Sequence, residues 1–413
     1  MPWKACSSMD VRREFVGLAL AGDGERRNIA LLCRRFGISR KTGYKWIGRY
    51  TSGSSVVDLA DRSRRPRCSP TRTSESLQRQ VIELRERHRA WGGRKLAARL
   101  KALGCPAVPA PSTISGILRR AGLLEESQSE MRRTPKRFEY ESANELWQMD
   151  YKGHVAMTGG GRCHPLTVLD DHSRYSLVLA ACADEQATTV QRHLTSAFRR
   201  YGLPRRMLAD NGSPWGTSWV AGGTDAGAWT GLAVWLLRLG VRLMHGRPRH
   251  PQTQGKEERF HRTLKAELLR WQRFADLSDA QKQMDPWRFT YNHERPHEAL
   301  GMSVPASRYR PSPRAFPERL PAIEYGPDDQ VRRVRPDGRI VFFQQKITIG
   351  AAFGGEDVAL RPTRDDGVWD AFYCDQPIGR IDRRNVGSEG RLRLHRPLAP
   401  LAGDAAARAC ERG

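Results

Sequence analysis

The stretch from His250 to Trp271, H-P-Q-T-Q-G-K-E-E-R-F-H-R-T-L-K-A-E-L-L-R-W, predicts an amphipathic helix with an acid on its charged side. No Pro or Gly interrupts it after Gly255. Apolar residues recur at the spacing of one helical face: Phe260, Leu264, Leu268 and Trp271. Beside them, the charged side carries Glu258, Arg262 and Lys265. Alone, this arrangement also fits a solvated surface ion pair, so its chemistry depends on acids elsewhere in the chain.

Two short segments each place an aspartate at the end of an apolar or β-prone run. L-W-Q-M-D-Y contains Asp150, and P-R-R-M-L-A-D-N-G-S-P-W contains Asp210. A strand in either place would deliver its carboxylate to the edge of a sheet. Two strand-borne aspartates and the helix-borne Glu258 make an oxygen ligand set of the kind that Mg²⁺ or Mn²⁺ prefers. Two such ions can clamp an in-line phosphoryl transfer.

These motifs resemble the DDE transposases of bacterial insertion sequences, whose core is similar to retroviral integrase. The matching residues are Asp150 in W-Q-M-D-Y, Asp210 in L-A-D-N-G and Glu258 in Q-G-K-E-E-R-F-H-R-T-L-K. The segment Y-N-H-E-R-P-H-E-A-L-G, from Tyr291, resembles the one that closes the core in this group. In the family pattern the acid after G-K-x is the third carboxylate, which selects Glu258 over Glu257. Helical phase agrees with that choice.

The resemblance covers about residues 10 to 310 and has one departure. The gap between Asp210 and Glu258 holds 47 residues, which is longer than the family's usual spacing. We assign the surplus to Ser213–Trp229, a segment rich in Gly, Trp and small residues that is typical of a mobile loop.

The composition indicates a polyanionic partner. Seventy Lys and Arg against 45 Asp and Glu give a formal charge of +25. The alternative is a basic protein from a GC-rich genome, in which codon bias favours Arg. The eight Cys include no C-x-x-C pair, so neither a zinc site nor a disulfide framework is expected. No run approaches a membrane span or a signal peptide, and we expect a bacterial cytoplasmic, nucleoid-associated protein.

We expect a multidomain chain with all-α helix-turn-helix modules, an α/β ribonuclease-H-like core and a small C-terminal β-barrel. The expected boundaries are a helix-turn-helix domain at 1–50, a basic linker at 51–73, a second helix-turn-helix domain at 74–124, a linker at 125–143, the catalytic core at 144–310, the barrel at 322–395 and a disordered tail at 396–413.

The first domain should contain three helices, at Val11–Ala21, Asn28–Phe36 and Arg40–Tyr50, with Tyr44 and Ile47 facing inward. The residues expected to face a DNA groove are Arg40, Lys41, Lys45 and Arg49. Linker arginines expected to follow phosphates are Arg62, Arg64, Arg65 and Arg67. The alternatives are a basic three-helix cluster without groove contacts and a merely solvated spacer. In the second domain, Ser112 or Thr113 should cap the last helix.

In the core we expect strands at Leu146–Tyr151, Cys163–Leu169, Tyr175–Ala181 and Arg206–Ala209, and helices at Asp184–Tyr201, Thr230–Leu239 and Gln252–Phe274. Asp170 and Asp171 are the main competing acids, and their polar turn predicts solvent exposure. Five short β-like runs after Ala322 predict the barrel.

The resemblance implies a transposase that binds terminal inverted repeats, cleaves the ends of an element and joins them to target DNA. It would use two Mg²⁺ or Mn²⁺ ions per active site and act as a homo-oligomer, at least a dimer, on double-stranded DNA. Lys265 would hold a terminal phosphate, and other polar residues would line the DNA path: His250, Gln252, Gln254, Arg259 and Arg262. The alternatives are a non-catalytic helix-turn-helix regulator with a decayed core and a nuclease that cuts without joining.

Overall fold

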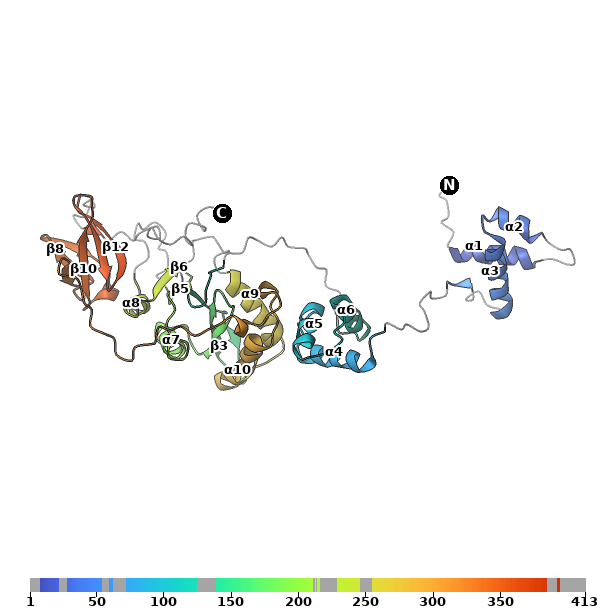
Figure 1. Cartoon of the computed structure of the whole chain (residues 1–413), viewed down its shortest axis with the longest axis horizontal. Helices are drawn as coiled ribbons and strands as arrows, with labels where there is room; N and C mark the ends of the chain where they lie inside the picture. Colours follow the sequence, from blue (N-terminus) through green and yellow to red (C-terminus); the bar gives the residue numbers. More distant parts are fainter. Residues whose placement is uncertain are drawn as a thin grey trace. The chain divides into compact units, whose positions relative to one another are not determined.

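The computed structural model describes residues 8–21, 28–53, 59–61, 72–124, 139–210, 212, 214–215, 229–245, 255–384 and 392–393. The chain divides into two compact units, Met1–Arg72 and Thr73–Gly413 (Figure 1). No helix in these described ranges is both long and apolar enough to cross a membrane.

The first unit contains the three expected helices, α1 (Ser8–Leu20), α2 (Ile29–Arg35) and α3 (Arg40–Gly53). Asn28 caps α2, and the Ser39 hydroxyl accepts a hydrogen bond from the backbone N–H of Thr42 at the start of α3. The prediction for the inner face of α3 was wrong at Tyr44, which is 59% exposed, whereas Trp46 is buried. Gly43 lets α3 approach the neighbouring helices closely, and this contact sets the rotation of α3.

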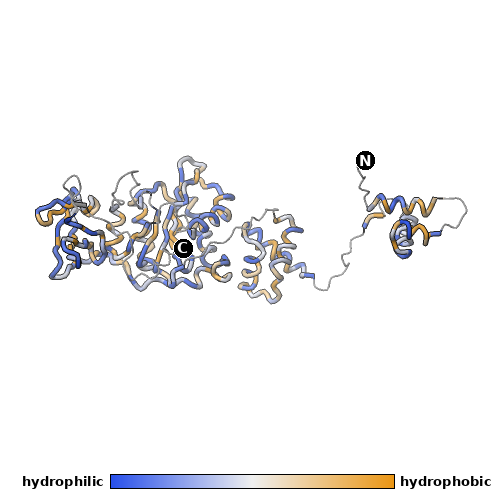
Figure 2. Tube along the Cα trace, turned by 90° about the horizontal axis from the view of Figure 1, so that it is seen from above, coloured by the Kyte–Doolittle hydropathy of each residue, from blue (hydrophilic) through white to orange (hydrophobic). Residues whose placement is uncertain are grey.

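The second helical module belongs to the other unit and contains α4 (Glu75–Arg87), α5 (Gly93–Ala102) and α6 (Pro111–Arg120). Its core gathers around the fully buried Trp91. The predicted cap was wrong, because α6 begins at Pro111 after Ala110 and has no side-chain cap. Hydrophobic and hydrophilic stretches alternate along the helical modules, as expected for helices with one buried face (Figure 2).

The core is built on a mixed sheet of six strands. The strands are β1 (Leu146–Tyr151), β2 (Val155–Ala156), β3 (Arg162–Asp170), β4 (Ser176–Cys182), β5 (Arg206–Ala209) and β6 (Arg242–His245). β3 pairs antiparallel with β1, β2 and β4, whereas β5 lies parallel to both β1 and β6. Three antiparallel strands followed by parallel ones agree with the ribonuclease-H-like plan; β2 and β6 were not predicted.

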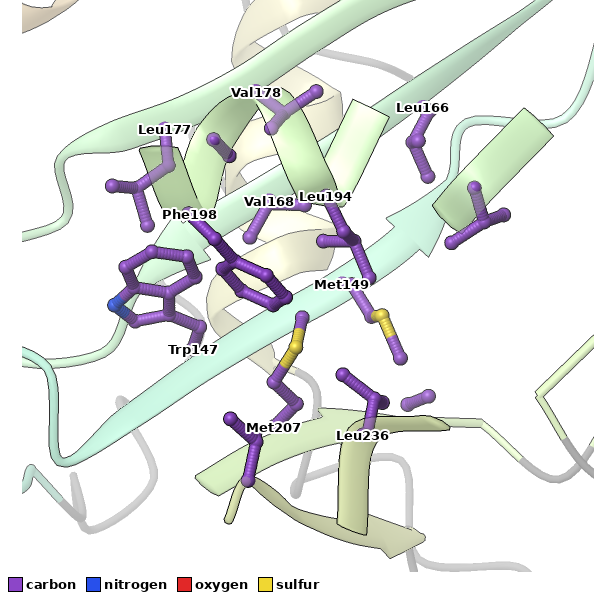
Figure 3. Close-up of a cluster of buried hydrophobic side chains, with 14 of the residues drawn as sticks. Trp147, Met149, Leu166, Val168, Leu177, Val178, Leu194, Phe198, Met207 and Leu236 are labelled. Carbon is purple, nitrogen blue, oxygen red and sulfur yellow. The ribbon is translucent and has the colours of Figure 1, made fainter. Parts of the chain in front are cut away.

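Helices cover both faces of this sheet. On one face, α7 (Ala187–Tyr201) and α8 (Gly231–Arg238) pack on an apolar cluster that includes Trp147, Phe198 and Leu236 (Figure 3). The helix predicted from Asp184 begins later, after Gln186. The other face is covered by α9 (Gly255–Leu264) and α10 (Leu277–His293) through a second apolar cluster. β1 packs Trp147 and Met149 into the first of these clusters, which holds the strand in a fixed register.

The helix expected at Gln252–Phe274 is shorter and less regular than predicted. Its described part is α9 followed by a π-helix, Lys265–Leu269, and Trp271 is 44% exposed rather than part of the apolar face. Phe260, Leu264 and Leu268 are buried as predicted. Residues 246–254 lie outside the described residues.

The segment that resembles the closing part of the core does close it. The Asn292 amide bonds both the N–H and the carbonyl of Ser176, which attaches α10 to β4. Arg295 donates to the Glu267 carboxylate at 2.8 Å, and both side chains are buried. Sequence periodicity did not predict α10, which carries Pro286 in its interior.

The C-terminal domain has two sheets rather than the single five-stranded unit expected. The strands are β7 (Gln330–Arg333), β8 (Arg339–Phe342), β9 (Gln345–Thr348), β10 (Asp357–Pro362), β11 (Val368–Tyr373), β12 (Gln376–Asp382) and β13 (Leu392–Arg393). β12, β11, β10 and β7 form one sheet, and β13, β9 and β8 form the other. In the described part of the chain these sheets are open, so a closed barrel is not shown.

The helix α8 connects the core to this β domain. Leu236 packs in the cluster of the core, whereas Val234 and Leu237 pack with the buried residues of the β domain. Such a helix, apolar on both sides, is stable only when both neighbours cover it.

We expect Leu237→Ala to lower the free energy of unfolding of the Thr73–Gly413 unit by about 2–5 kcal/mol, because a buried leucine leaves a cavity. Leu320→Ala, at an exposed position, is the control and should stay within about 0.5 kcal/mol of wild type. Urea unfolding of the full chain measures both. Equal midpoints for the two variants would show that α8 does not support the β domain.

Candidate active site

The parallel pairing of β1 and β5 brings Asp150 and Asp210 together. Leu146 lies opposite Arg206 and Gln148 opposite Leu208, so the same register places Asp150 beside Asp210 just beyond the end of β5. Neighbouring strands lie about 4.8 Å apart, which puts the two side chains within reach of one ion. The carboxyl ends of two parallel strands thus form the expected acidic edge.

Burial and the charge of Asp210 raise the pKa of Asp150 from its ordinary value of 3.8 to about 7. The Asp150 side chain is 25% exposed, and its Oδ1 accepts a hydrogen bond from the backbone N–H of Tyr151 at 2.8 Å. The charge of Asp210 disfavours the ionisation of Asp150, and a cation between them would remove that penalty. The donor set therefore fits a divalent cation with oxygen ligands.

The loop that follows Asp210 is fixed at its first turn. The Asp210 carboxylate accepts a hydrogen bond from the N–H of Gly212 at 3.0 Å, and Trp215 is buried against Tyr151, with ring centroids 5.7 Å apart. The expected loop, Ser213–Trp229, is therefore packed at Trp215. Residues 216–228 of that loop lie outside the described residues.

The inner face of α9 carries two polar side chains that sequence analysis missed. Glu257 is fully buried, and its Oε2 lies 3.2 Å from the Thr167 hydroxyl on β3. His261, one helical turn later, places Nε2 at 2.8 Å from the same hydroxyl and Nδ1 at 3.8 Å from Asp150 Oδ2. Glu257 lies three residues before Phe260, and His261 lies three residues before Leu264. This helical spacing would have predicted that both side chains face the core.

Glu258 lies on the outer side of α9 and is exposed, together with Arg259, Arg262 and Lys265. It forms no hydrogen bond or ion pair with another described residue. Within the described ranges, no group of three or more His, Cys, Asp or Glu side chains is arranged to hold a metal ion. The structure thus brings Asp150 and Asp210 together, while Glu258 as the third carboxylate stays a prediction.

The interpretation of Asp170 and Asp171 as solvated turn residues was wrong, because both are buried. Asp170 accepts hydrogen bonds from the backbone N–H groups of Asn144 and Ser173. Asp171 pairs with Lys256 at 2.5 Å, and burial lowers the pKa of Lys256 to about 8. Both acids therefore bond to other groups of the core, and Asp171 holds the first turn of α9 against the sheet.

The helix-turn-helix face predicted to meet DNA is only partly free. Arg40, Lys41 and Lys45 are exposed on α3. Arg49 is half-buried, stacks on Trp46 at 4.9 Å and donates to the carbonyl of Ala60. Seven of the expected DNA contacts lie outside the described residues: Arg62, Arg64, Arg65, Arg67, His250, Gln252 and Gln254.

Family models match most of the chain in consecutive blocks. Two integrase core domain models match residues 141–251 and 239–305, and the model of the IS481 family transposase C-terminal domain matches 329–389. A helix-turn-helix domain model matches 11–67 and a homeodomain-like domain model matches 42–118. The chain belongs to the integrase-core transposases of insertion sequences.

Among curated relatives of this transposase, an uncharacterized protein of insertion element IS407 from Burkholderia multivorans is 29% identical over 60% of this chain and 88% of its own length. A protein of insertion element IS476 from Xanthomonas euvesicatoria is 27% identical over 57% of this chain, and the match spans 65% of that relative. A chain of a simian T-cell lymphotropic virus intasome is 18% identical, with 72% of this chain and 97% of that chain covered at a TM-score of 0.35.

The raised pKa of Asp150 should make the stability of the metal-free transposase depend on pH. The protonated Asp150 carboxyl contributes its full stabilisation below about pH 4, and this contribution is lost as the pH rises through 7. Asp150→Asn should therefore raise the free energy of unfolding at pH 8 by roughly 2–4 kcal/mol and change it little at pH 4.

Urea unfolding in EDTA at both pH values measures this difference. Asp328→Asn, at an exposed position, controls for the loss of a negative charge. A gain in Asp150→Asn that is the same at both pH values would contradict the assignment.

Proposed function

We propose that this protein is a DNA transposase that binds the terminal inverted repeats of its element, cleaves phosphodiester bonds at the ends and joins the 3′-hydroxyl ends to target DNA. The observation that carries the proposal is the shared register of β1 and β5, which sets Asp150 beside Asp210 at one edge of the sheet. The integrase core models over 141–305 support it.

Asp150, Asp210 and Glu258 would hold two Mg²⁺ or Mn²⁺ ions. Such ions, when bound, activate a water or a 3′-hydroxyl and stabilise the leaving oxygen of a phosphodiester. The chain's own residues bind and orient the DNA end. The exposed Lys265 lies seven residues after Glu258 and extends the same side of the helix toward a terminal phosphate. Cleavage would be a hydrolysis, in which water attacks the phosphodiester and a 3′-hydroxyl leaves. Joining would be a transesterification, in which that 3′-hydroxyl attacks a target phosphodiester and displaces the adjoining target hydroxyl. Neither step needs a protein nucleophile.

The distribution of charge supports DNA binding by the N-terminal modules. Residues 1–72 hold 16 Lys and Arg against six Asp and Glu, and residues 73–124 hold ten against three. The β domain is different, because residues 326–384 hold ten of each. Most of the phosphate attraction therefore comes from the two helical modules. Two DNA ends must be held together, so we propose at least a homodimer.

We expect Asp150→Asn and Glu258→Gln to reduce joining of labelled ends in Mg²⁺ by more than about 100-fold, since even outer-shell changes at metal sites cost 10–100-fold. End binding in a gel-shift assay should stay at the wild-type level. The assay uses the full chain and DNA carrying the element's own inverted repeats.

The outcomes of this assay separate the candidate functions. A regulator with a decayed core would bind ends but neither cut nor join them. A simple nuclease would cut without joining. Joining at the wild-type rate by either variant would remove the carboxylate mechanism.

The exposed face of α3 should contribute phosphate contacts. Arg40→Ala and Lys41→Ala should each reduce the slope of log affinity against log salt concentration by about 0.9, the value for one phosphate contact. Arg34→Ala, at an exposed position on α2, removes the same charge elsewhere and should leave the slope unchanged. Fluorescence anisotropy across a salt series measures all three. Equal slopes in every variant would exclude this face from the DNA interface.

A further inference from the structure

A buried polar cluster lies directly behind the acidic edge of the sheet. It consists of Thr167 on β3 and of Glu257 and His261 on the inner face of α9. All three side chains are buried, and the Thr167 hydroxyl donates to the backbone carbonyl of Asp150. The carboxylate chemistry proposed above does not use any of them.

The Thr167 hydroxyl is the centre of this cluster. It lies 2.9 Å from the carbonyl of Asp150, 3.2 Å from Glu257 Oε2 and 2.8 Å from His261 Nε2. A hydroxyl has one proton to donate, and a backbone carbonyl can only accept one. Thr167 therefore donates to Asp150, and it accepts from the other two side chains.

The Thr167 proton also determines where the neighbouring protons lie. His261 donates from Nε2–H, which leaves the lone pair of Nδ1 facing Asp150 Oδ2 at 3.8 Å. Glu257 can donate to Thr167 only as a neutral carboxyl. Its other oxygen, Oε1, is buried without a hydrogen-bond partner in the described part of the chain. An ionised carboxylate in that position would lack essential hydrogen bonds, whereas a neutral one is tolerated.

Burial, together with the nearby charge of Asp150, raises the pKa of Glu257 well above its usual value. Burial likewise lowers the pKa of His261 to about 3. Two adjacent glutamates thus occupy opposite environments, since Glu257 is buried and Glu258 is exposed.

We propose that Glu257 is a positioning residue, not a metal ligand, and that with Thr167 and His261 it fixes β1 at Asp150 so that the Asp150 carboxylate is preorganised for a divalent cation. The inference rests on the proposed function. It separates the roles of the two glutamates by geometry, and it explains why an acid is tolerated on the apolar face of α9. A hydrogen-bond donor at position 257 is what the arrangement requires.

The test compares Glu257→Gln with Glu257→Leu in the full chain. Gln is of nearly the same shape and donates to Thr167 through its amide, so it should rescue the positioning. Leu fills the space without a donor. We expect Glu257→Leu to weaken Mn²⁺ binding, measured by calorimetry without DNA, by about 10–100-fold, the usual cost of losing an outer-shell partner. Glu257→Gln should stay within about threefold of wild type.

Further variants separate positioning from folding. Thr167→Val should weaken Mn²⁺ binding as Glu257→Leu does, and Thr167→Ser should restore it. Thr263→Ala, which removes a hydroxyl bonded within α9 itself, is the matched control. Thermal unfolding in EDTA should show that every variant is folded. The Leu and Val variants place apolar side chains at the buried positions 257 and 167, where such side chains are tolerated.

Two results would overturn the positioning role. One is loss of Mn²⁺ binding in Glu257→Gln to the level of Glu258→Gln, which would make Glu257 an ionised ligand. The other is unchanged Mn²⁺ affinity in Glu257→Leu. If wild type joins DNA ends in either case, the proposed function survives and only the positioning role fails. A wild-type protein that binds Mn²⁺ but never joins ends would overturn the proposed function instead.

Discussion

The parallel pairing of β1 with β5 is the constraint on which the rest of the site depends. Its register leaves no freedom in the relative height of Asp150 and Asp210, because a slip of one residue would turn every side chain of β1 to the other face. Such a slip would remove Trp147 and Met149, which are both fully buried, from the apolar cluster in which they pack. The apolar layers on either side of the sheet thus fix the positions of the two acids.

The acids near this edge divide into those that stabilise the fold and those that oppose it. Asp171 is buried but satisfied, since it accepts from Gln148 and from Lys256, and it attaches α9 to the sheet. Asp150 is only partly buried and lies beside another carboxylate, and its pKa is raised to about 7 as a result. Unfavourable electrostatics at a site held by favourable packing are typical of functional sites, where a ligand supplies the missing charge.

Sequence patterns predicted the parts that depend on local composition. The apolar runs that end at Asp150 and Asp210 gave the strands, and the spacing of Phe260 and Leu264 gave the buried face of α9. Contacts from distant segments decided the rest. The rotation of α3 follows from the close contact of Gly43 with Cys33. The two turn acids are buried because backbone N–H groups from an earlier segment, at Tyr140 and Asn144, donate to them. The helix α10 forms although Pro286 lies in its interior. Helical phase placed Glu258 on the charged side of the helix, in line with Arg262 and Lys265. It could not reveal that Glu257 contacts Thr167 on β3.

The segment that lengthens this core is anchored to two different parts of the protein. At its start, Trp215 packs on Tyr151, the residue after Asp150. At its end, Trp229 meets Phe353 of the β domain, with ring centroids 5.5 Å apart, and leads into α8, which both clusters share. The described ends of this segment therefore contact the strand of Asp150 at one end and the β domain at the other. The β domain carries no net charge over residues 326–384, so it adds nothing to the positive charge that would attract DNA.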